Sequence, residues 1–127
     1  MESQDKVQKR VLVVEDEAVI GRVFRKVLTG HGFTVDIVPN GVMAINNLNH
    51  RYYNLCILDL RMPGIDGIEL YKYLHDNYRE LSRNVVFTTG DITGSQVSGF
   101  LKRSERVCLQ KPFTPRELLL AVELAIN

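Results

Sequence analysis

Short apolar runs alternate with amphipathic segments along the whole chain. Four runs are continuous: 11–14 (VLVV), 55–58 (LCIL), 85–87 (VVF) and 107–109 (VCL). A fifth, 33–38 (FTVDIV), alternates apolar and polar positions, which is typical of a strand with less cover. Helical patterns fill the gaps, so the sequence predicts five strand–helix repeats. Because continuous apolar strands are covered on both faces, we expect a doubly wound parallel α/β domain.

Local signals mark the helix ends. The first helix carries apolar residues at 19, 20, 23, 24, 27 and 28 on one predicted face, and it ends at the glycines of 30–32. The last helix opens with Thr114 as N-cap, Pro115 at the first position and Glu117 closing a capping box. The segment 93–103 should be the fourth helix, yet it contains Gly94 and Gly99. Since each glycine in a helix interior costs about 1 kcal/mol, we expect either a frayed surface helix or a loose switch element.

Composition excludes several classes of protein. The 127 residues carry a formal net charge of +1, with no block of like charge to suggest direct binding to nucleic acid. No apolar run approaches the roughly 18 residues of a membrane span, and the first ten residues have no secretory pattern. We therefore expect one cytoplasmic domain over 1–127, with 1–9 as a disordered or tag-like lead. Cys56 and Cys108 lie in apolar runs and are expected to be buried, reduced thiols. The three histidines, His31, His50 and His75, are not spaced as metal ligands usually are, and we expect them on the surface.

Polar residues gather where the predicted strands end. In open parallel sheets, ligands bind outside the carboxyl ends of the strands. The residues at these ends are Glu15, Asp16, Asp59, Thr88, Thr89 and Lys111. Carboxylates at this solvent-exposed edge of the sheet, the rim, are suitable ligands for Mg²⁺. An aspartate carboxylate can also attack a phosphoryl group to form an aspartyl-phosphate. A lysine and a hydroxyl nearby would hold the remaining phosphoryl oxygens.

Simpler interpretations of the single residues remain open. Asp16 could be an N-cap of the first helix, Thr88 and Thr89 ordinary strand residues, and Lys111 a solvated lysine at the edge of the sheet. Asp59 is harder to explain in this way, because it directly follows a buried strand and no helical pattern begins before residue 67.

Four motifs identify a known family: "LVVEDE", "LDLRMPGIDGIEL", "VVFTTGD" and "LQKPF". Asp59 and Thr89 are 30 residues apart, and Thr89 and Lys111 are 22 apart. With these motifs in this order, the chain resembles the receiver domain of two-component response regulators over nearly its whole length. The resemblance implies a flavodoxin-like (βα)₅ fold with strand order 2-1-3-4-5. It also implies a cis bond between Lys111 and Pro112, whereas the sequence alone favours trans.

The resemblance further implies the chemistry of the site. Asp59 would accept a phosphoryl group from a histidine of a partner kinase or phosphotransfer protein. Asp16, Asp59 and the backbone carbonyl of Arg61 would hold Mg²⁺, for which Mn²⁺ is a possible substitute. Glu15 would act through a metal-bound water, and Thr89 and Lys111 would contact phosphoryl oxygens. Output to an effector would pass through the face around the fourth and fifth strands and the fourth helix, and the exposed flank of the first helix would meet the kinase.

Two departures from the family pattern affect these expectations. Glu15 stands where the family usually has an aspartate, so we expect Mg²⁺ binding to be retained with altered affinity. Cys108 stands where many members have Tyr or Phe. The rotation of that aromatic side chain reports phosphorylation in the family, and a cysteine cannot provide it.

Rival functions make different demands on the sequence. A phosphatase of the haloacid dehalogenase type would need an acid two residues after the nucleophile, where this chain has Arg61. A degenerate receiver, acting as a binding module without phosphorylation, would lack Asp59, Thr89 or Lys111. We therefore expect a receiver with self-phosphorylation and self-dephosphorylation chemistry only. It could be a stand-alone regulator or part of a longer chain such as a hybrid histidine kinase.

Overall fold

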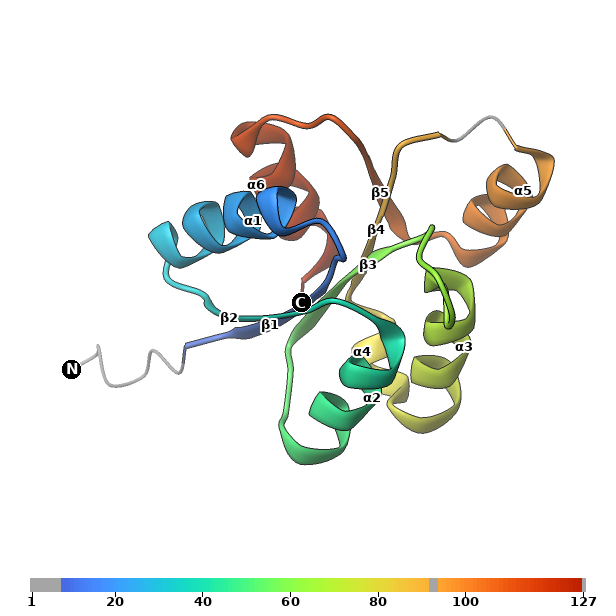
Figure 1. Cartoon of the computed structure of the whole chain (residues 1–127), viewed down its shortest axis with the longest axis horizontal. Coiled ribbons are helices and arrows are strands. Elements are labelled where there is room, and N and C mark those ends of the chain that lie inside the picture. The colour runs from blue at the N-terminus through green and yellow to red at the C-terminus, as the bar shows by residue number, and fades with distance from the viewer. Residues whose placement is uncertain (1–7, 92–93, 127) are drawn as a thin grey trace.

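Five parallel strands form a single sheet in the computed structural model, which describes residues 8–91 and 94–126 (Figure 1). The strands are β1 (Arg10–Val14), β2 (Thr34–Val38), β3 (Leu55–Asp59), β4 (Val85–Thr89) and β5 (Val107–Gln110). Their order is β2-β1-β3-β4-β5, and each neighbouring pair is parallel. The flavodoxin-like topology is therefore confirmed. Residues 1–7 of the expected lead lie outside the described residues.

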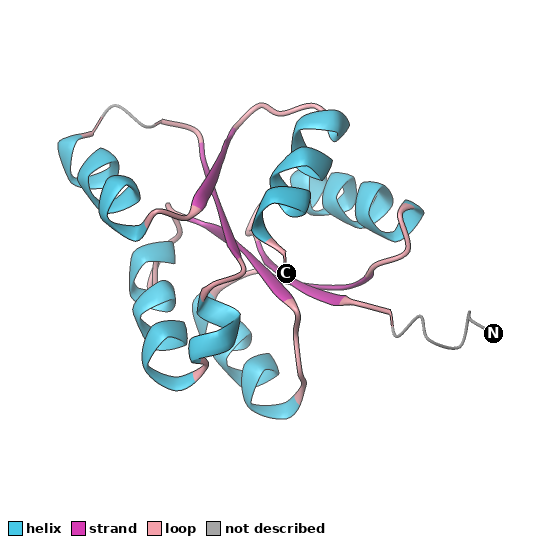
Figure 2. Cartoon of the chain, turned by 180° about the vertical axis from the view of Figure 1, so that it is seen from behind, coloured by secondary structure: helices cyan, strands magenta, loops and turns pink. Residues whose placement is uncertain are grey.

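Helices cover both faces of this sheet. They are α1 (Ala18–Gly30), α2 (Gly41–His50), α3 (Gly67–Asn77), α4 (Arg79–Ser82), α5 (Ser95–Ser104) and α6 (Pro115–Ala125). Helices α1 and α6 pack on one face, and α2, α3, α4 and α5 lie on the other (Figures 1 and 2). The expectation of one helix between successive strands was wrong at α4. That helix is too short to show a helical period in the sequence, and it is anchored by the buried Leu81 and Ser82.

Each face of the sheet has its own apolar core. Leu12, Leu58 and Phe87 face the side of α2, α3 and α5, whereas Val13 and Ile57 face α1 and α6. All five side chains are at most 1% exposed. Burying a side chain of this size contributes about 1.5–3 kcal/mol, so the continuous apolar runs fix the central strands between two layers of helices.

The predicted helix ends are largely confirmed. Thr114 Oγ1 accepts a hydrogen bond from the Glu117 N–H at 3.1 Å, and Glu117 Oε1 accepts one from the Thr114 N–H at 2.8 Å. The predicted apolar face of α1 was wrong in part, because Val19 is 65% exposed and Val23 is 38% exposed. The helix buries a narrower stripe that begins at Gly21.

The two cysteines differ in their surroundings. Both are free, and Cys56 is buried as expected, but Cys108 is exposed. Strand β5 lies at the edge of the sheet. Its side chains alternate between two faces: Leu109 is buried on the face covered by α6, whereas Cys108 and Gln110 lie on a face that is largely uncovered. The prediction of a buried Cys108 was therefore wrong. The three histidines are exposed, as predicted. Across the described residues, no helix combines the length and the apolar character needed to cross a membrane.

Candidate functional site

The carboxyl ends of β1, β3 and β4 meet at one edge of the sheet. Asp59 is the last residue of β3, next to Thr88 of β4 in the register of the sheet. Only 4% of Asp59 is exposed, and Glu15, which follows β1, is equally buried at 4%. The buried strands therefore hold two carboxylates close to the surface in fixed positions.

Lys111 bridges these two carboxylates. Its Nζ lies 2.9 Å from Asp59 Oδ2 and 2.9 Å from Glu15 Oε1, and only 15% of its side chain is exposed. Its backbone N–H donates to the carbonyl of Thr89 at 2.8 Å, which fixes the residue just after β5. The interpretation of Lys111 as a solvated edge lysine was therefore wrong.

Backbone donors hold the other oxygen of each carboxylate. The Arg61 N–H donates to Asp59 Oδ1 at 3.1 Å, and the Glu17 N–H donates to Glu15 Oε2 at 3.1 Å. Each carboxylate thus accepts one hydrogen bond from the backbone and lies in close contact with the ammonium group of Lys111. Charge-assisted bonds of this kind orient a carboxylate strongly, so Asp59 is presented in one defined position.

Protonation at the site reflects burial and the shared cation. Burial raises the pKa of Glu15, and the hydrogen bonds from Lys111 and from the Glu17 N–H offset this only in part. For Lys111, burial alone would lower the pKa, but its hydrogen bonds to Glu15 and Asp59 outweigh burial and raise it above the ordinary value. Lys111 is therefore fully charged at neutral pH, and it neutralises one of the two buried carboxylates.

A cluster of acids extends from the bridge to the surface. Carboxylate oxygens of Glu15, Asp16 and Glu17 all lie within 4.8 Å of one another, and Glu17 Oε1 is 3.7 Å from Lys111 Nζ. Lys111 Nζ thus pairs with three carboxylates, those of Glu15, Glu17 and Asp59, and Asp16 adds a fourth carboxylate beside them. This excess of negative charge on hard oxygen atoms fits the ligand preference of Mg²⁺.

Two residues of this cluster, Asp16 and Glu17, have surroundings that differ from the expectation. Asp16 is not the N-cap of α1: Glu17 occupies that position, without a side-chain cap bond. Glu17 was not predicted as a neighbour of Lys111, although the acidic run "EDE" follows β1 directly.

Thr89 lies at the end of β4, but its hydroxyl serves its own loop. Thr89 is fully buried, and Oγ1 donates to the Asp91 carbonyl at 3.0 Å and accepts from the Asp91 N–H at 3.2 Å. The structure thus brings Glu15, Asp59 and Lys111 into direct contact, while the Thr89 hydroxyl is turned toward residue 91.

The loop after Asp59 depends on two glycines, one within the loop and one at the start of α3. Gly64 has φ +78°, a conformation that turns the chain back toward the sheet and that favours glycine. Gly67 begins α3 directly against the end of β3: a Cβ atom there would lie 2.5 Å from the Asp59 carbonyl oxygen and 2.8 Å from Leu60 Cα. A side chain at position 67 would therefore displace the backbone of Asp59 itself.

The Lys111–Pro112 peptide bond is cis. The resemblance implied this geometry, and the expectation of trans from the sequence alone was wrong.

Comparison with known proteins shows the family of the chain. The model of the response regulator receiver domain matches residues 11–123, so the chain belongs to that family of signalling domains. The transcriptional regulatory protein ResD of Bacillus subtilis is 34% identical over 120 residues, which cover 94% of this chain and 49% of ResD. The chain thus spans about half the length of this curated relative.

Solved receiver structures share the fold. The chemotaxis protein CheY4 of Vibrio cholerae superposes with a TM-score of 0.84 at 22% identity, over 94% of this chain and all of CheY4. The receiver domain of the sensor histidine kinase PA1611 of Pseudomonas aeruginosa, solved with a magnesium ion coordinated in its active site cleft, gives a TM-score of 0.80 at 23% identity. That match covers 94% of this chain and 98% of the PA1611 domain.

Proposed function

We propose that this domain is the phosphoacceptor of a two-component phosphorelay and that Asp59 receives the phosphoryl group. The observation that carries the proposal is the bridge from Lys111 to Asp59 and Glu15, 2.9 Å on each side, at a rim rich in carboxylates. Lys111 lies where it can neutralise a phosphoryl group placed on Asp59.

In the proposed step, a carboxylate oxygen of Asp59 attacks the phosphorus atom of a phosphohistidine. The new O–P bond forms as the P–N bond breaks, and the imidazole nitrogen leaves with the electron pair. Because Asp59 reacts as a carboxylate, no general base has to remove a proton. Lys111 then exchanges its bond to Asp59 for one to a phosphoryl oxygen, and Thr89 exchanges its bonds to Asp91 for a phosphoryl oxygen.

The acidic cluster supports a divalent cation in this site. Asp16, Asp59 and the backbone carbonyl of Arg61 would hold Mg²⁺, or Mn²⁺ in its place, and Glu15 would act through a metal-bound water. When bound, the ion neutralises charge on the phosphoryl oxygens. The excess of carboxylates over the one ammonium group is the feature of this chain that favours such binding.

Labelling by a small phosphodonor tests the proposal. With acetyl phosphate and Mg²⁺, intact-mass spectrometry should show one added phosphoryl group, absent with EDTA and absent in Asp59→Asn. Equal labelling of wild type and Asp59→Asn would refute the assignment of the acceptor. No labelling of the wild type with any donor would favour the alternative, a degenerate receiver that acts by binding alone.

We propose that the histidine kinase or phosphotransfer partner contacts α1. Val19 and Val23 are exposed on this helix, and Arg22 lies between them on the exposed surface. Arg25 is a poor choice for a test because its Nη1 donates to the Val35 carbonyl at 3.1 Å and so supports the fold. The variant Val19→Asp/Arg22→Glu should slow transfer from a phosphohistidine partner and leave labelling by acetyl phosphate unchanged. If both reactions slow equally, α1 acts on the site or the fold and not on docking.

We also propose that the output passes through β4 and α5. Position 108 holds no aromatic residue. Instead, a cluster of three aromatic rings connects β4, which ends at Thr89, with α5. The Phe87 ring lies 5.2 Å from the Phe100 ring of α5 and 5.4 Å from the Tyr71 ring of α3, both edge-on. A shift of β4 on phosphorylation would thus reach α5, and through it an effector domain or protein.

Hydrogen exchange tests this route. Labelling of Asp59 should change the amide exchange of α5 in the wild type, and the change should be lost in Phe100→Ala, with labelling itself preserved. As a control, Leu124→Ala alters an exposed apolar residue of α6 and should leave the response of α5 intact. An unchanged response of α5 in Phe100→Ala would exclude the aromatic route.

A further inference from the structure

A groove separates α3 from α5 on one face of the sheet. Side chains of both helices line it, namely Tyr71, Lys72, His75 and Asp76 of α3 and Phe100, Arg103 and Ser104 of α5. Its volume is about 720 Å³. Sites for small organic molecules usually enclose roughly 300–1,000 Å³, so the groove has room for several side chains of a partner.

The floor of this groove is aromatic. The ring of Phe100 is 8% exposed, and its centroid lies 5.8 Å from that of Tyr71, with the two rings edge-on. The fully buried Phe87 supports both from below, at 5.2 Å from Phe100 and 5.4 Å from Tyr71. Rings packed in this way hold each other in place, so an apolar side chain that enters the groove meets a preformed surface.

Two cations flank this floor. Lys72 of α3 and Arg103 of α5 are exposed and line the groove from opposite sides. The guanidinium group of Arg103 lies along α5, since a Cβ atom on Gly99 would be 3.1 Å from its Nη1. Among the described lining residues the one acid is Asp76, which lies 3.7 Å from His75 Nδ1. Within the part of the chain that the structure describes, no carboxylate forms an ion pair with Lys72 or Arg103.

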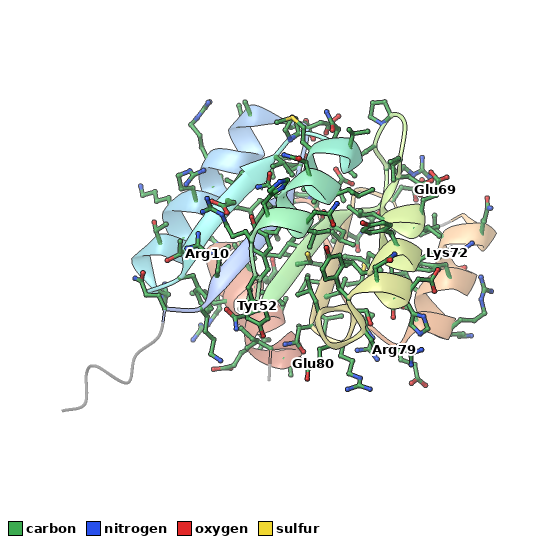
Figure 3. All side chains as sticks on the ribbon, turned by 90° about the horizontal axis from the view of Figure 1, so that it is seen from below. Arg10, Tyr52, Glu69, Lys72, Arg79 and Glu80 are labelled. Atoms are coloured by element: carbon green, nitrogen blue, oxygen red, sulfur yellow. The ribbon has the colours of Figure 1, made fainter. Side chains whose placement is uncertain are left out.

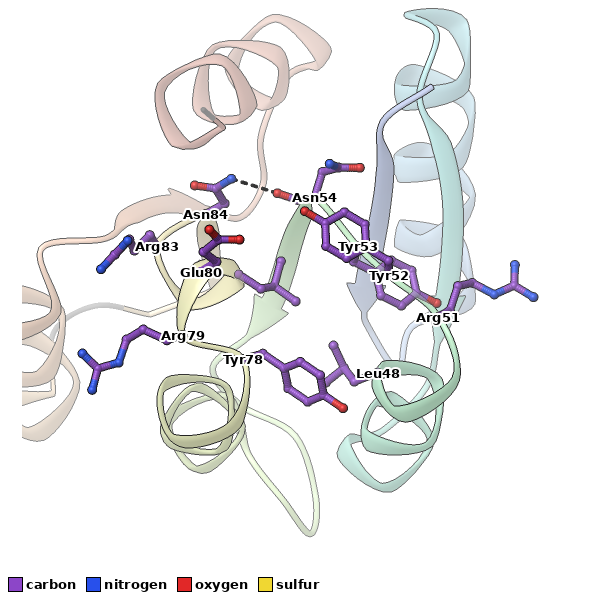
Figure 4. Close-up of a pocket in the computed structure, with 11 residues that line it drawn as sticks. Leu48, Arg51, Tyr52, Tyr53, Asn54, Tyr78, Arg79, Glu80, Arg83 and Asn84 are labelled. Carbon is purple, nitrogen blue, oxygen red and sulfur yellow. Dashed lines mark hydrogen bonds between the residues drawn. The ribbon is translucent and has the colours of Figure 1, made fainter. Parts of the chain in front are cut away.

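Further positive charge lies next to the groove. Arg79 and Arg83 stand at the two ends of α4, and their guanidinium groups point away from the cavity beside α4, on the side where α5 lies (Figure 4). Arg106 Nη1 donates to the Arg83 carbonyl at 2.7 Å, which ties the end of α4 to the segment after α5. Figure 3 shows Lys72 and Arg79 on the half of the molecule that carries α5. The fold thus gathers cations that are scattered along the sequence.

We propose that this groove binds an acidic peptide segment of a partner protein. One apolar side chain of the segment lies on Tyr71 and Phe100. Carboxylates on either side of it pair with Lys72 and Arg103, because guanidinium and ammonium groups bind carboxylates through charge-assisted hydrogen bonds. None of these four residues belongs to the phosphorylation site, so the proposal does not rest on phosphorylation of Asp59.

Other anionic partners fit the groove less well. A single-stranded nucleic acid matches the positive charge, but it binds largely by stacking bases on exposed aromatic rings, and Phe100 is only 8% exposed. An anionic membrane is flat and would contact the exposed cations without reaching the floor between the helices. An acidic peptide can satisfy the cations and the aromatic floor together.

Nuclear magnetic resonance tests the proposal with a defined probe, a nine-residue peptide that carries one leucine between two blocks of four glutamates. Titration of ¹⁵N-labelled protein in EDTA should shift amide signals of residues 70–77 and 99–104. A peptide with glycine in place of the leucine should bind at least tenfold more weakly. Absence of shifts at 5 mM probe, or shifts confined to other residues, would overturn the proposal. Equal binding of the glycine peptide would show attraction by charge alone, and equally tight binding of an eight-nucleotide DNA strand at the same amides would assign the surface to phosphate groups; either result would also overturn it.

Variants separate the groove from the net charge of the domain. Lys72→Glu/Arg103→Gln should weaken binding of the leucine peptide at least tenfold, because one pairing cation is lost and the other is replaced by a repelling charge. Lys26→Glu/Arg116→Gln makes the same change in net charge at exposed positions of α1 and α6, and it should leave binding within twofold of the wild type. Charges farther away than about 8 Å are largely screened at physiological salt. Equal loss in both double variants would refute the site.

The variant Asp59→Asn distinguishes this proposal from the proposed function. It removes the phosphoacceptor and leaves the groove unchanged, so it should bind the leucine peptide as tightly as the wild type does. Loss of peptide binding in Asp59→Asn would show that the shifts report the acidic rim and would overturn the proposal. Failure of labelling at Asp59, with peptide binding intact, would contradict the proposed function alone.

Discussion

Replacing Gly67 by alanine tests how closely the start of α3 controls Asp59. The added Cβ would lie 2.5 Å from the Asp59 carbonyl oxygen and 2.8 Å from Leu60 Cα, both backbone atoms that no rotamer change can move aside. Overpacking of this kind costs about 1–3 kcal/mol. The higher helix propensity of alanine offsets at most about 1 kcal/mol of this cost. We therefore expect Gly67→Ala to lower the free energy of unfolding by about 1–2 kcal/mol.

The effect on phosphorylation should be larger than the effect on stability. Either the end of β3 or the start of α3 has to shift, and Asp59 shifts with the former. Since a misplacement of about 1 Å can cost on the order of 10²-fold in rate, we expect labelling by acetyl phosphate to slow at least tenfold. Rates from intact-mass time courses and unfolding curves in urea measure the two effects.

Gly30 provides the matched control. It ends α1, and a Cβ atom there would have no atom within 4 Å. Gly30→Ala should therefore keep the wild-type labelling rate and lose no stability. If Gly67→Ala matched Gly30→Ala in both assays, the close approach of α3 to Asp59 would have no role in positioning the acceptor.

Three further predictions concern protons, the metal and the lifetime of the phosphoryl group. Burial and the hydrogen bond to Asp36 raise the pKa of Tyr53 to about 12, so its stabilising effect is complete below pH 10 and is lost as pH rises from 10 to about 12. Ultraviolet titration should show a tyrosine step near pH 12 that disappears in Tyr53→Phe, and identical titration curves would contradict the assignment. Asp16→Asn should raise the Mg²⁺ concentration for half-maximal labelling by about tenfold, because a charged oxygen ligand is lost; an unchanged value would remove Asp16 from the metal site. Arg61→Ala and Asp91→Ala should each shorten the lifetime of phosphorylated Asp59, and the double variant should be no faster than the faster single one. Single-turnover loss of labelled phosphate measures this, and additive effects would show that the two residues act independently.

The sequence determined the fold and the composition of the rim. Apolar runs such as 55–58 have one stable environment, a strand covered on both faces, and the order of strands and helices along the chain then brings their carboxyl ends together. Asp59 could be singled out because a carboxylate directly after a buried strand has few structural explanations. The capping box at the start of α6 could be recognised for a related reason: it consists of contacts between residues three apart.

Tertiary structure decided how these residues are used. Lys111 and Asp59 are 52 residues apart, and only the packing of the sheet places Nζ between Asp59 and Glu15 rather than in water. Cys108 lies in an apolar run like that of Cys56, yet it is exposed because β5 is an edge strand, which no local pattern reveals. Helix α4 is a single turn, stabilised by Leu81 and by contacts with distant segments, so its existence and the cavity beside it depend on those contacts. Local interactions are encoded within a few neighbouring residues, whereas burial and charge pairing depend on which distant segments the fold brings together.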